Sequence, residues 1–310
     1  MTSLEVRGIT KRFGALTAVD EVAFQVAPGE ICGFIGPNGA GKTTTMRICA
    51  TLELPDHGDV LVDGVSVLEE PRLARARIGF MPDAYGAYAN TTVLEYLDFF
   101  ARAYHLAGAQ KRQTIERVVA FTTLDSMLEK EIAALSKGMK QRLCLAKTLL
   151  HDPGVLILDE PAAGLDPRAR VELRELVRAL AEMGKAILLS SHILSELAEM
   201  CSTVVVIERG KLRGAGAVGD VVRSVTPRTR FFLRALAGPE AAERTLLERP
   251  HVLEVRRERD GVSFELEGGP QEQAELLAAL VGAGLRPTEF STRETDLEDA
   301  FLSLTEGRLQ

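Results

Sequence analysis

Eight consecutive residues have the spacing G-x-x-x-x-G-K-[ST], from Gly36 to Thr43. They follow the apolar run Ile31–Ile35 and precede a helical pattern over Thr43–Ala50, a strand–loop–helix setting in which successive N–H groups curl around phosphates. There Lys42 would bridge the β- and γ-phosphates of a nucleotide, and the Thr43 hydroxyl would be a magnesium ligand. The expected phosphate contacts are Gly36, Pro37, Asn38, Gly39, Ala40, Gly41, Lys42, Thr43 and Thr44. The flanking strand and helix disfavour the alternative, a glycine turn with a surface lysine.

Two acidic residues, Asp159 and Glu160, follow the run Val155–Leu158, which is apolar on both faces as a central parallel strand requires. The carboxyl end of such a strand lies next to a phosphate-binding loop. Asp159 is therefore expected to hold magnesium directly or through water. Glu160 is expected to orient or deprotonate an attacking water. Acidic residues commonly end strands, so this interpretation depends on the glycine-rich segment.

A third segment narrows the class of nucleotide hydrolase. Residues 135–142, Leu-Ser-Lys-Gly-Met-Lys-Gln-Arg, precede a helical pattern and resemble the L-S-G-G-Q signature of the ATP-binding-cassette (ABC) ATPases. Four further elements resemble those of the family in the right order, over residues 2–216: Phe13 at the adenine-stacking position, Ile78–Pro82 before the Q-loop, Gly164–Asp166 in the D-loop, and His192 as the switch histidine. The resemblance implies an ATP hydrolase with an α/β P-loop ABC ATPase core.

The resemblance also implies a composite site. Two subunits would face each other head to tail, and each ATP would lie between the phosphate loop of one and Ser136 and Gly138 of the other. His192 would contact the γ-phosphate, acting in catalysis with Glu160 and Lys42. Each residue has a simpler alternative: Ser136 as a helix cap, His192 as a turn residue, and Phe13 as a core residue instead of an adenine-stacking one.

The chain departs from the family pattern at two places. Asp83 stands where the family usually has glutamine; its carboxylate keeps an oxygen ligand for magnesium, adds charge and loses the amide donor. Lys137 and Met139 replace the first glycine and the glutamine of the signature, while the backbone of Gly138 is retained. The Asp83 departure is the more serious, because that position links the nucleotide to the helical insertion.

Short apolar runs alternate with helical patterns over residues 1–217, as in a parallel sheet covered by helices. Besides the two strands above, Ala186–Leu189 is predicted as a central strand. Leu4–Ile9 and Val19–Val26 predict a flanking antiparallel sheet. Residues 84–150 are interpreted as a helical subdomain within this ATPase domain, and residues 203–215 as a closing hairpin.

Residues 218–310 are predicted to form a C-terminal accessory domain. Their patterns follow the order β-α-β-β-α-β, the order of ferredoxin-like α+β domains. The dipeptide Asp260-Gly261 predicts a two-residue hairpin between the middle strands. A final amphipathic helix is expected over Asp296–Leu304.

Composition limits the classes of partner and location. The 310 residues carry a net charge of −7, so no basic footprint favours nucleic acid. We expect no secretory signal at the start and no run near the ~18 apolar residues of a membrane span. The four cysteines are spaced for neither zinc nor disulfides. A membrane role would therefore require a separate permease, with this chain peripheral on the cytoplasmic face of the membrane, or cytoplasmic when unassembled.

The segment Thr295–Thr305 resembles the L-E-D-x-F-x-x-L-T ending of ATPases paired with ABC-2-type permeases, including the daunorubicin-resistance-like exporters. It implies export. The resemblance to the ABC ATPases implies a homo- or heterodimer of ATPase subunits that uses ATP and Mg²⁺. The main alternative is a soluble ABC ATPase acting on ribosomes or in repair. Translation-type members usually carry two cassettes and repair-type members a long coiled coil, and neither feature is found here. A metabolic P-loop kinase would have no use for Ser136, Glu160 and His192 together.

Overall fold

The computed structural model describes residues 3–83, 86, 90–191, 193–225 and 229–293. The chain divides into two compact units, with the division between Val218 and Gly219. The first unit contains two sheets and the second unit one, and each unit has its own cluster of buried apolar side chains.

The first unit is built on a six-stranded sheet. Its strands, in order across the sheet, are β10 (Lys211–Ala217), β9 (Thr203–Glu208), β3 (Ile31–Ile35), β8 (Ala186–Ser190), β7 (Val155–Leu158) and β6 (Ile78–Met81). All neighbours pair in parallel except β9 and β10, which form an antiparallel hairpin. Strands β3, β7 and β8 are buried along their whole length, which explains why their sequences are apolar at every position except Gly33 and Ser190.

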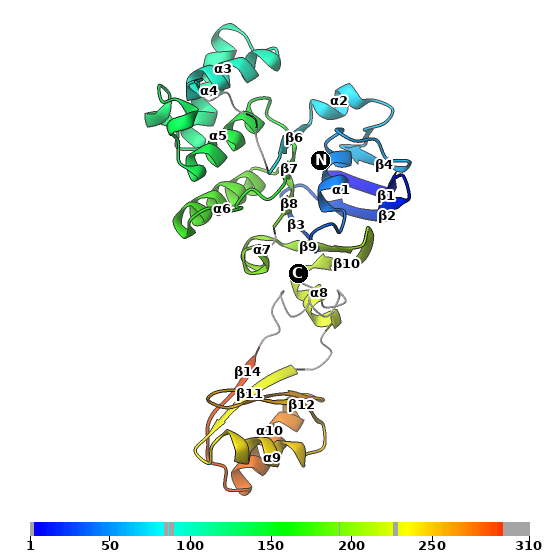
Figure 1. Ribbon diagram of the computed structural model, residues 1–310, viewed down its shortest axis with the longest axis vertical. Helices are drawn as coiled ribbons and strands as arrows, with labels where there is room; N and C mark the ends of the chain where they lie inside the picture. The colour runs from blue at the N-terminus through cyan, green and yellow to red at the C-terminus, as the bar shows by residue number, and fades with distance from the viewer. Residues whose placement is uncertain (1–2, 84–85, 87–89, 192, 226–228, 294–310) are drawn as a thin grey trace. The chain divides into compact units, whose positions relative to one another are not determined.

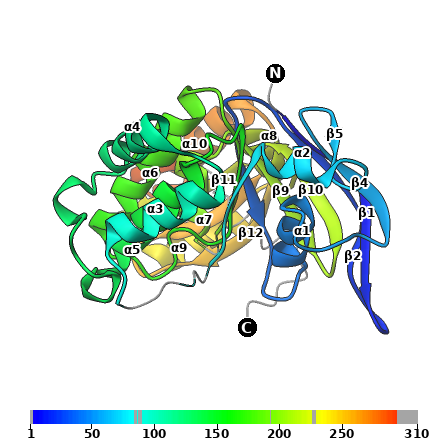
Figure 2. The same cartoon turned by 90° about the horizontal axis from the view of Figure 1, so that it is seen from above.

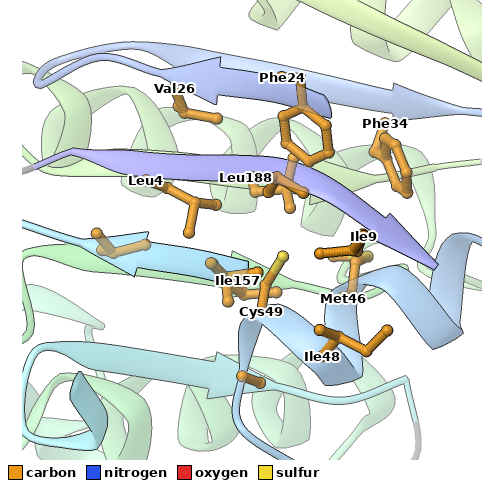
Figure 3. Close-up of a cluster of buried hydrophobic side chains, with 14 of the residues drawn as sticks. Leu4, Ile9, Phe24, Val26, Phe34, Met46, Ile48, Cys49, Ile157 and Leu188 are labelled. Carbon is orange, nitrogen blue, oxygen red and sulfur yellow. The ribbon is translucent and has the colours of Figure 1, made fainter. Parts of the chain in front are cut away.

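A second, antiparallel sheet flanks the first. Its strands, in order, are β2 (Leu16–Val26), β1 (Leu4–Phe13), β4 (His57–Val62) and β5 (Val65–Ser66). Side chains from this sheet, from the six-stranded sheet and from helix α1 (Lys42–Cys49) form one apolar cluster (Figure 3). Phe24 and Phe34, one from each sheet, lie 5.4 Å apart between ring centroids. This core fixes the position of α1 and of the loop that precedes it.

Helices cover the opposite side of the six-stranded sheet. Figures 1 and 2 place the flanking sheet and α1 on one side, and α3, α5 and α6 on the other. The helices that follow α1 in this unit are α2 (Pro71–Arg75), α3 (Val93–Ala103), α4 (Gly108–Phe121), α5 (Lys137–Leu149), α6 (Pro167–Glu182) and α7 (Leu194–Met200), with α8 (Val218–Val225) at the division. Two 3₁₀ turns, η1 (Asp125–Met127) and η2 (Ile132–Ala134), precede α5.

The region predicted as helical does contain α3, α4 and α5, which pack against one another. Its first helix begins at a capping box: Thr92 accepts from the Glu95 N–H, and the Glu95 carboxylate accepts from the Thr92 N–H at 2.8 Å. Along the described part of the chain, no helix is both long and apolar enough to cross a bilayer.

The second unit has the element order β11 (Thr229–Ala235), α9 (Pro239–Leu247), β12 (Val252–Arg257), β13 (Val262–Leu266), α10 (Pro270–Gly282) and β14 (Pro287–Arg293). The sheet order is β12-β13-β11-β14, and every neighbouring pair is antiparallel. Phe231, Phe264 and Phe290 pack together at its core. The final helix expected over Asp296–Leu304 lies outside the described residues.

One local prediction in this unit is wrong by a residue. The Glu258 N–H donates to the Gly261 carbonyl at 2.9 Å, so Arg259 and Asp260 form the centre of the hairpin turn, not Asp260 and Gly261. Gly261 is required for a different reason. A Cβ atom there would lie 2.5 Å from the Leu233 carbonyl oxygen and 2.6 Å from the Phe232 ring, so the glycine allows β11 to pass close by.

Candidate functional site

The glycine-rich segment forms the loop between the end of β3 and the start of α1. Gly39 and Gly41 have φ angles of 77° and 103°, a region that favours glycine, and they turn the backbone into the first turn of the helix. The first N–H groups of an α-helix have no acceptor within the helix, so this turn presents donors to an anion. The loop is braced from outside, because the Gly210 N–H in the β9–β10 turn donates to the Ala40 carbonyl at 2.9 Å.

Lys42, the first residue of α1, is largely enclosed by the loop, with 9 % of its surface exposed. Its Nζ donates to the carbonyl oxygens of Gly36 at 2.6 Å and Pro37 at 3.1 Å. Burial lowers the pKa of Lys42, and the charges of Glu160 and Asp159 partly oppose this effect. The ammonium group is therefore held over the loop, where it has little competing hydration.

The acid pair lies at the carboxyl end of β7. Asp159 is buried, and its N–H donates to the Met81 carbonyl of β6 at 2.8 Å. Glu160 has a φ of 49°, the left-handed region that non-glycine residues rarely adopt. Both carboxylates act electrostatically on Lys42, so the structure brings together the phosphate loop and the two acids.

A serine that sequence reasoning missed joins the two acids. The Ser190 hydroxyl, at the end of β8, donates to Asp159 Oδ1 at 2.7 Å and accepts from the Glu160 N–H at 2.9 Å. The apolar run Ala186–Leu189 predicted its strand, but nothing local revealed that this strand lies beside β7.

The oxygen atoms near the loop are of the type that magnesium prefers. Thr43 is exposed in the first turn of α1, and the buried Asp159 lies just after the end of β7. In the described ranges, no group of three or more His, Cys, Asp or Glu residues could hold a metal by themselves. Magnesium typically takes one or two protein ligands together with phosphates and water, so the oxygen atoms of Thr43 and Asp159 suit this ion. Asp83, two residues beyond β6, has an exposed side chain.

The signature residues lie at the start of α5, beside α6. Ser136 caps this helix by accepting from the Met139 N–H at 3.3 Å. Gly138 faces α6, where an added Cβ would lie 3.0 Å from that of Ala169, and the Lys137 ammonium lies against Gly164 in the loop before α6. Asp166, the last residue of the predicted D-loop, caps α6 by accepting from the Ala169 N–H at 3.0 Å.

Phe13 ends β1, where it pairs with Leu16 at the start of β2. Its side chain is 48 % exposed, which rules out a core role, and the Lys11 ammonium lies 5.3 Å from its ring centroid. Two residues beyond Leu16, the Ala18 carbonyl faces Gly41, so this hairpin borders the phosphate loop. His192 lies outside the described residues.

Comparison with known proteins agrees with this arrangement. Residues 19–163 match the family model described as ABC transporter. Nod factor export ATP-binding protein I of Paraburkholderia xenovorans (strain LB400) is 40% identical over 222 residues, which cover 72% of this chain and 73% of that protein. The uncharacterized ABC transporter ATP-binding protein YhcH of Bacillus subtilis (strain 168) is 35% identical, and the match covers 98% of this chain and 96% of that protein.

A solved structure described as the ATP binding subunit of an ABC transporter superposes with a TM-score of 0.65 and 32% identity. It covers 71% of this chain and 92% of the solved one. The family match, the relatives that span nearly the whole chain and the geometry of the phosphate loop lead to the same result. The chain belongs to the ABC transporter family as an ATP-binding subunit that hydrolyses ATP.

Proposed function

We propose that this subunit powers export through a separate membrane permease of the ABC-2 type. The observation that carries its catalytic part is the acid pair held at the end of β7 within electrostatic range of Lys42. The export direction is supported by relatives named Nod factor export ATP-binding protein I, which are 34–40% identical to this chain. The ABC-2 assignment is supported by the resemblance of the segment Thr295–Thr305.

In this proposal the residues around the phosphate loop have separate roles in binding ATP, holding magnesium and activating water. The loop N–H groups and Lys42 bind the phosphates, which replace the carbonyl partners of the ammonium. Phe13 offers its exposed ring face to the adenine. Thr43 and Asp159, with Asp83 beyond β6, hold magnesium, which neutralises charge on the phosphates. Glu160 orients the attacking water and accepts its proton.

The site is completed by a second subunit arranged head to tail. Ser136 uses an oxygen lone pair to cap α5, so its O–H proton remains able to donate to the γ-phosphate of the facing subunit. Capping and phosphate contact are therefore compatible. The Gly138 N–H lies in the first turn of the same helix and adds a second donor. His192 completes the γ-phosphate contacts in this proposal.

The second unit is assigned a ferredoxin-like fold. Its element order β-α-β-β-α-β and its antiparallel sheet order β12-β13-β11-β14 support this assignment.

In this proposal the membrane permease, and not the ATPase subunit, selects the substrate that is transported.

The proposed role of Glu160 is tested with Glu160→Gln, which keeps the size of the side chain and removes the base. We expect ATP hydrolysis to fall roughly 10²–10⁴-fold while ATP binding persists. Size-exclusion chromatography with ATP and Mg²⁺ should then detect a stable dimer. The matched control is Glu182→Gln, the same chemical change at an exposed position ending α6. Near-normal hydrolysis by Glu160→Gln would remove Glu160 from this role.

The transporter assignment is tested with the same variant, tagged and mixed with detergent-solubilised membranes of the source cell, ATP and Mg²⁺. Mass spectrometry of the purified complex should identify a stoichiometric polytopic membrane protein. Its family would show whether the permease is of the ABC-2 type. Recovery of ribosomes or soluble complexes without a membrane protein would contradict the proposal in favour of the soluble ATPase class.

A further inference from the structure

Ser190 is a buried polar residue at the end of a central strand of the six-stranded sheet. It ends β8, which lies between β3 and β7, and its side chain is fully buried. The register pairs Phe34 with Ser190 on one side and Leu158 with Leu189 on the other. Ser190 therefore lies level with the end of β3, just before the phosphate loop, and with the start of the acid pair.

The hydroxyl of Ser190 is both a hydrogen-bond donor and a hydrogen-bond acceptor. It donates to Asp159 Oδ1 at 2.7 Å and accepts from the Glu160 N–H at 2.9 Å. The first bond fixes the rotamer of Asp159 and leaves its other oxygen for a metal. The second holds the backbone of Glu160, whose φ of 49° is unfavourable for a side chain with a Cβ. One side chain thus constrains both members of the acid pair.

Other serines of this chain with a purely structural role form hydrogen bonds to groups only two or three residues away. Ser191, the next residue, accepts from the N–H of Ile193 two residues away. Ser66 of β5 accepts from the N–H groups of Leu68 and Glu69, both at 3.1 Å, in a similar turn. Ser190 instead bonds two groups that lie 31 and 30 residues away, at the site itself.

We infer that Ser190 is a positioning residue for ATP hydrolysis, which sets the direction of the Asp159 carboxylate and of the Glu160 side chain relative to the phosphate loop. This inference rests on the proposed roles of those two acids. Without the hydroxyl, Glu160 can relax from its left-handed conformation, and the buried Asp159 can rotate. Removing the Ser190 hydroxyl leaves the contacts between the phosphate loop and the nucleotide in place. The change should therefore lower the rate of ATP hydrolysis and leave ATP binding nearly unchanged.

The test compares Ser190→Ala with Ser190→Thr, which restores a hydroxyl on the same carbon, and with Ser66→Ala. The last variant removes another buried serine hydroxyl, 8 % exposed, that also makes two hydrogen bonds but lies in the flanking sheet. For Ser190→Ala we expect kcat to fall about tenfold or more, with KM for ATP changed less than about twofold. Ser190→Thr should recover most of the rate, and Ser66→Ala should match the wild type in kcat.

Two results would overturn the inference: an unchanged kcat in Ser190→Ala, or a raised KM with kcat retained. If Ser190→Ala does not fold, Ser190→Cys takes its place, because a thiol of similar size is a weak donor and acceptor. Glu160→Gln, assayed in parallel, distinguishes a failure of the positioning role of Ser190 from a failure of the proposed function. If it loses turnover while Ser190→Ala keeps it, only the positioning role fails; if Glu160→Gln keeps turnover, the proposed function itself fails.

Discussion

Replacing Gly36 by alanine adds a single methyl group at the point where the phosphate loop passes β9. The added Cβ would lie 2.9 Å from Ile207 Cγ2, 3.0 Å from the Ala40 Cβ, and closer still to the Ile207 carbonyl oxygen. Real Cβ atoms essentially never approach other atoms within 3.0 Å. The nearest atom belongs to the backbone of a buried strand, so no side-chain rotation relieves the contact. The loop itself has to move away from β9.

The size of the effect follows from this geometry. Overpacking a rigid site costs about 1–3 kcal/mol, and a clash with backbone places Gly36→Ala near the upper end. For a unit of this size, about 3 kcal/mol corresponds to a fall in Tm of roughly 6–12 °C. Displacing the loop also misdirects its N–H groups, and a shift on the order of 1 Å costs about 100-fold where geometry is critical.

Differential scanning calorimetry with and without ATP measures both effects. ATP raises the Tm only of the unit that binds it, which identifies the relevant transition in a two-unit chain. Gly36→Ala should lower that Tm and shrink the ATP-induced shift. Gly282→Ala is the control, because that glycine ends α10 with open space around its Cβ position. A Gly36→Ala protein with the wild-type Tm and the wild-type ATP shift would refute the reasoning.

Two further predictions concern titrating groups. Because burial lowers the pKa of Lys42 below its usual 10.5 and phosphate binds the ammonium form, ATP affinity should fall as pH rises through the lowered pKa. Fluorescence titrations of ATP binding between pH 7 and 10 test this prediction. As a control, Lys42→Ala should bind ATP weakly and without that pH dependence. An ATP affinity of the wild type that rises with pH would contradict the prediction. Burial raises the pKa of Cys32 and Cys49 to about 12 and also raises those of Cys144 and Cys201. A thiol reagent at pH 8 should therefore label none of them quickly before unfolding and all four after it, and one fast thiol in the native protein would be inconsistent with this burial.

The central strands were predictable because burial on both faces leaves a sequence signal. Ile31–Ile35 and Val155–Leu158 have the bounds expected from their apolar runs, and β8 extends one residue beyond its run. The strand Ile78–Met81 was not recognised, since Gly79 leaves it only three apolar side chains, whereas β3 and β7 each have four. That glycine is a packing requirement: an added Cβ would lie 2.7 Å from Thr148 Cγ2 and 2.8 Å from Leu156 Cδ2.

The candidate site was predictable where a motif is continuous in the chain. The phosphate loop was predicted from its spacing, and the acid pair from its place after an apolar strand in a chain that contains such a loop. Ser190 was not, since its role depends on β8 lying beside β7, and that adjacency is set by the order of strands in the sheet. Likewise Gly210 supports Ala40 from a turn 170 residues later, which no local pattern shows.

Strand β3 lies in the middle of the six-stranded sheet but is the first strand of that sheet in the chain. Its two neighbours, β8 and β9, begin at Ala186 and Thr203, more than 150 residues after β3 begins at Ile31. At translation rates of roughly 5–20 residues per second, the nascent chain carries the whole phosphate motif for on the order of 10 s before these strands exist. During that interval β3 is an unpaired apolar segment, and the motif has neither its sheet nor its brace at Gly210. A messenger truncated before residue 203 would therefore encode every residue of the phosphate loop and yield a product unable to bind ATP.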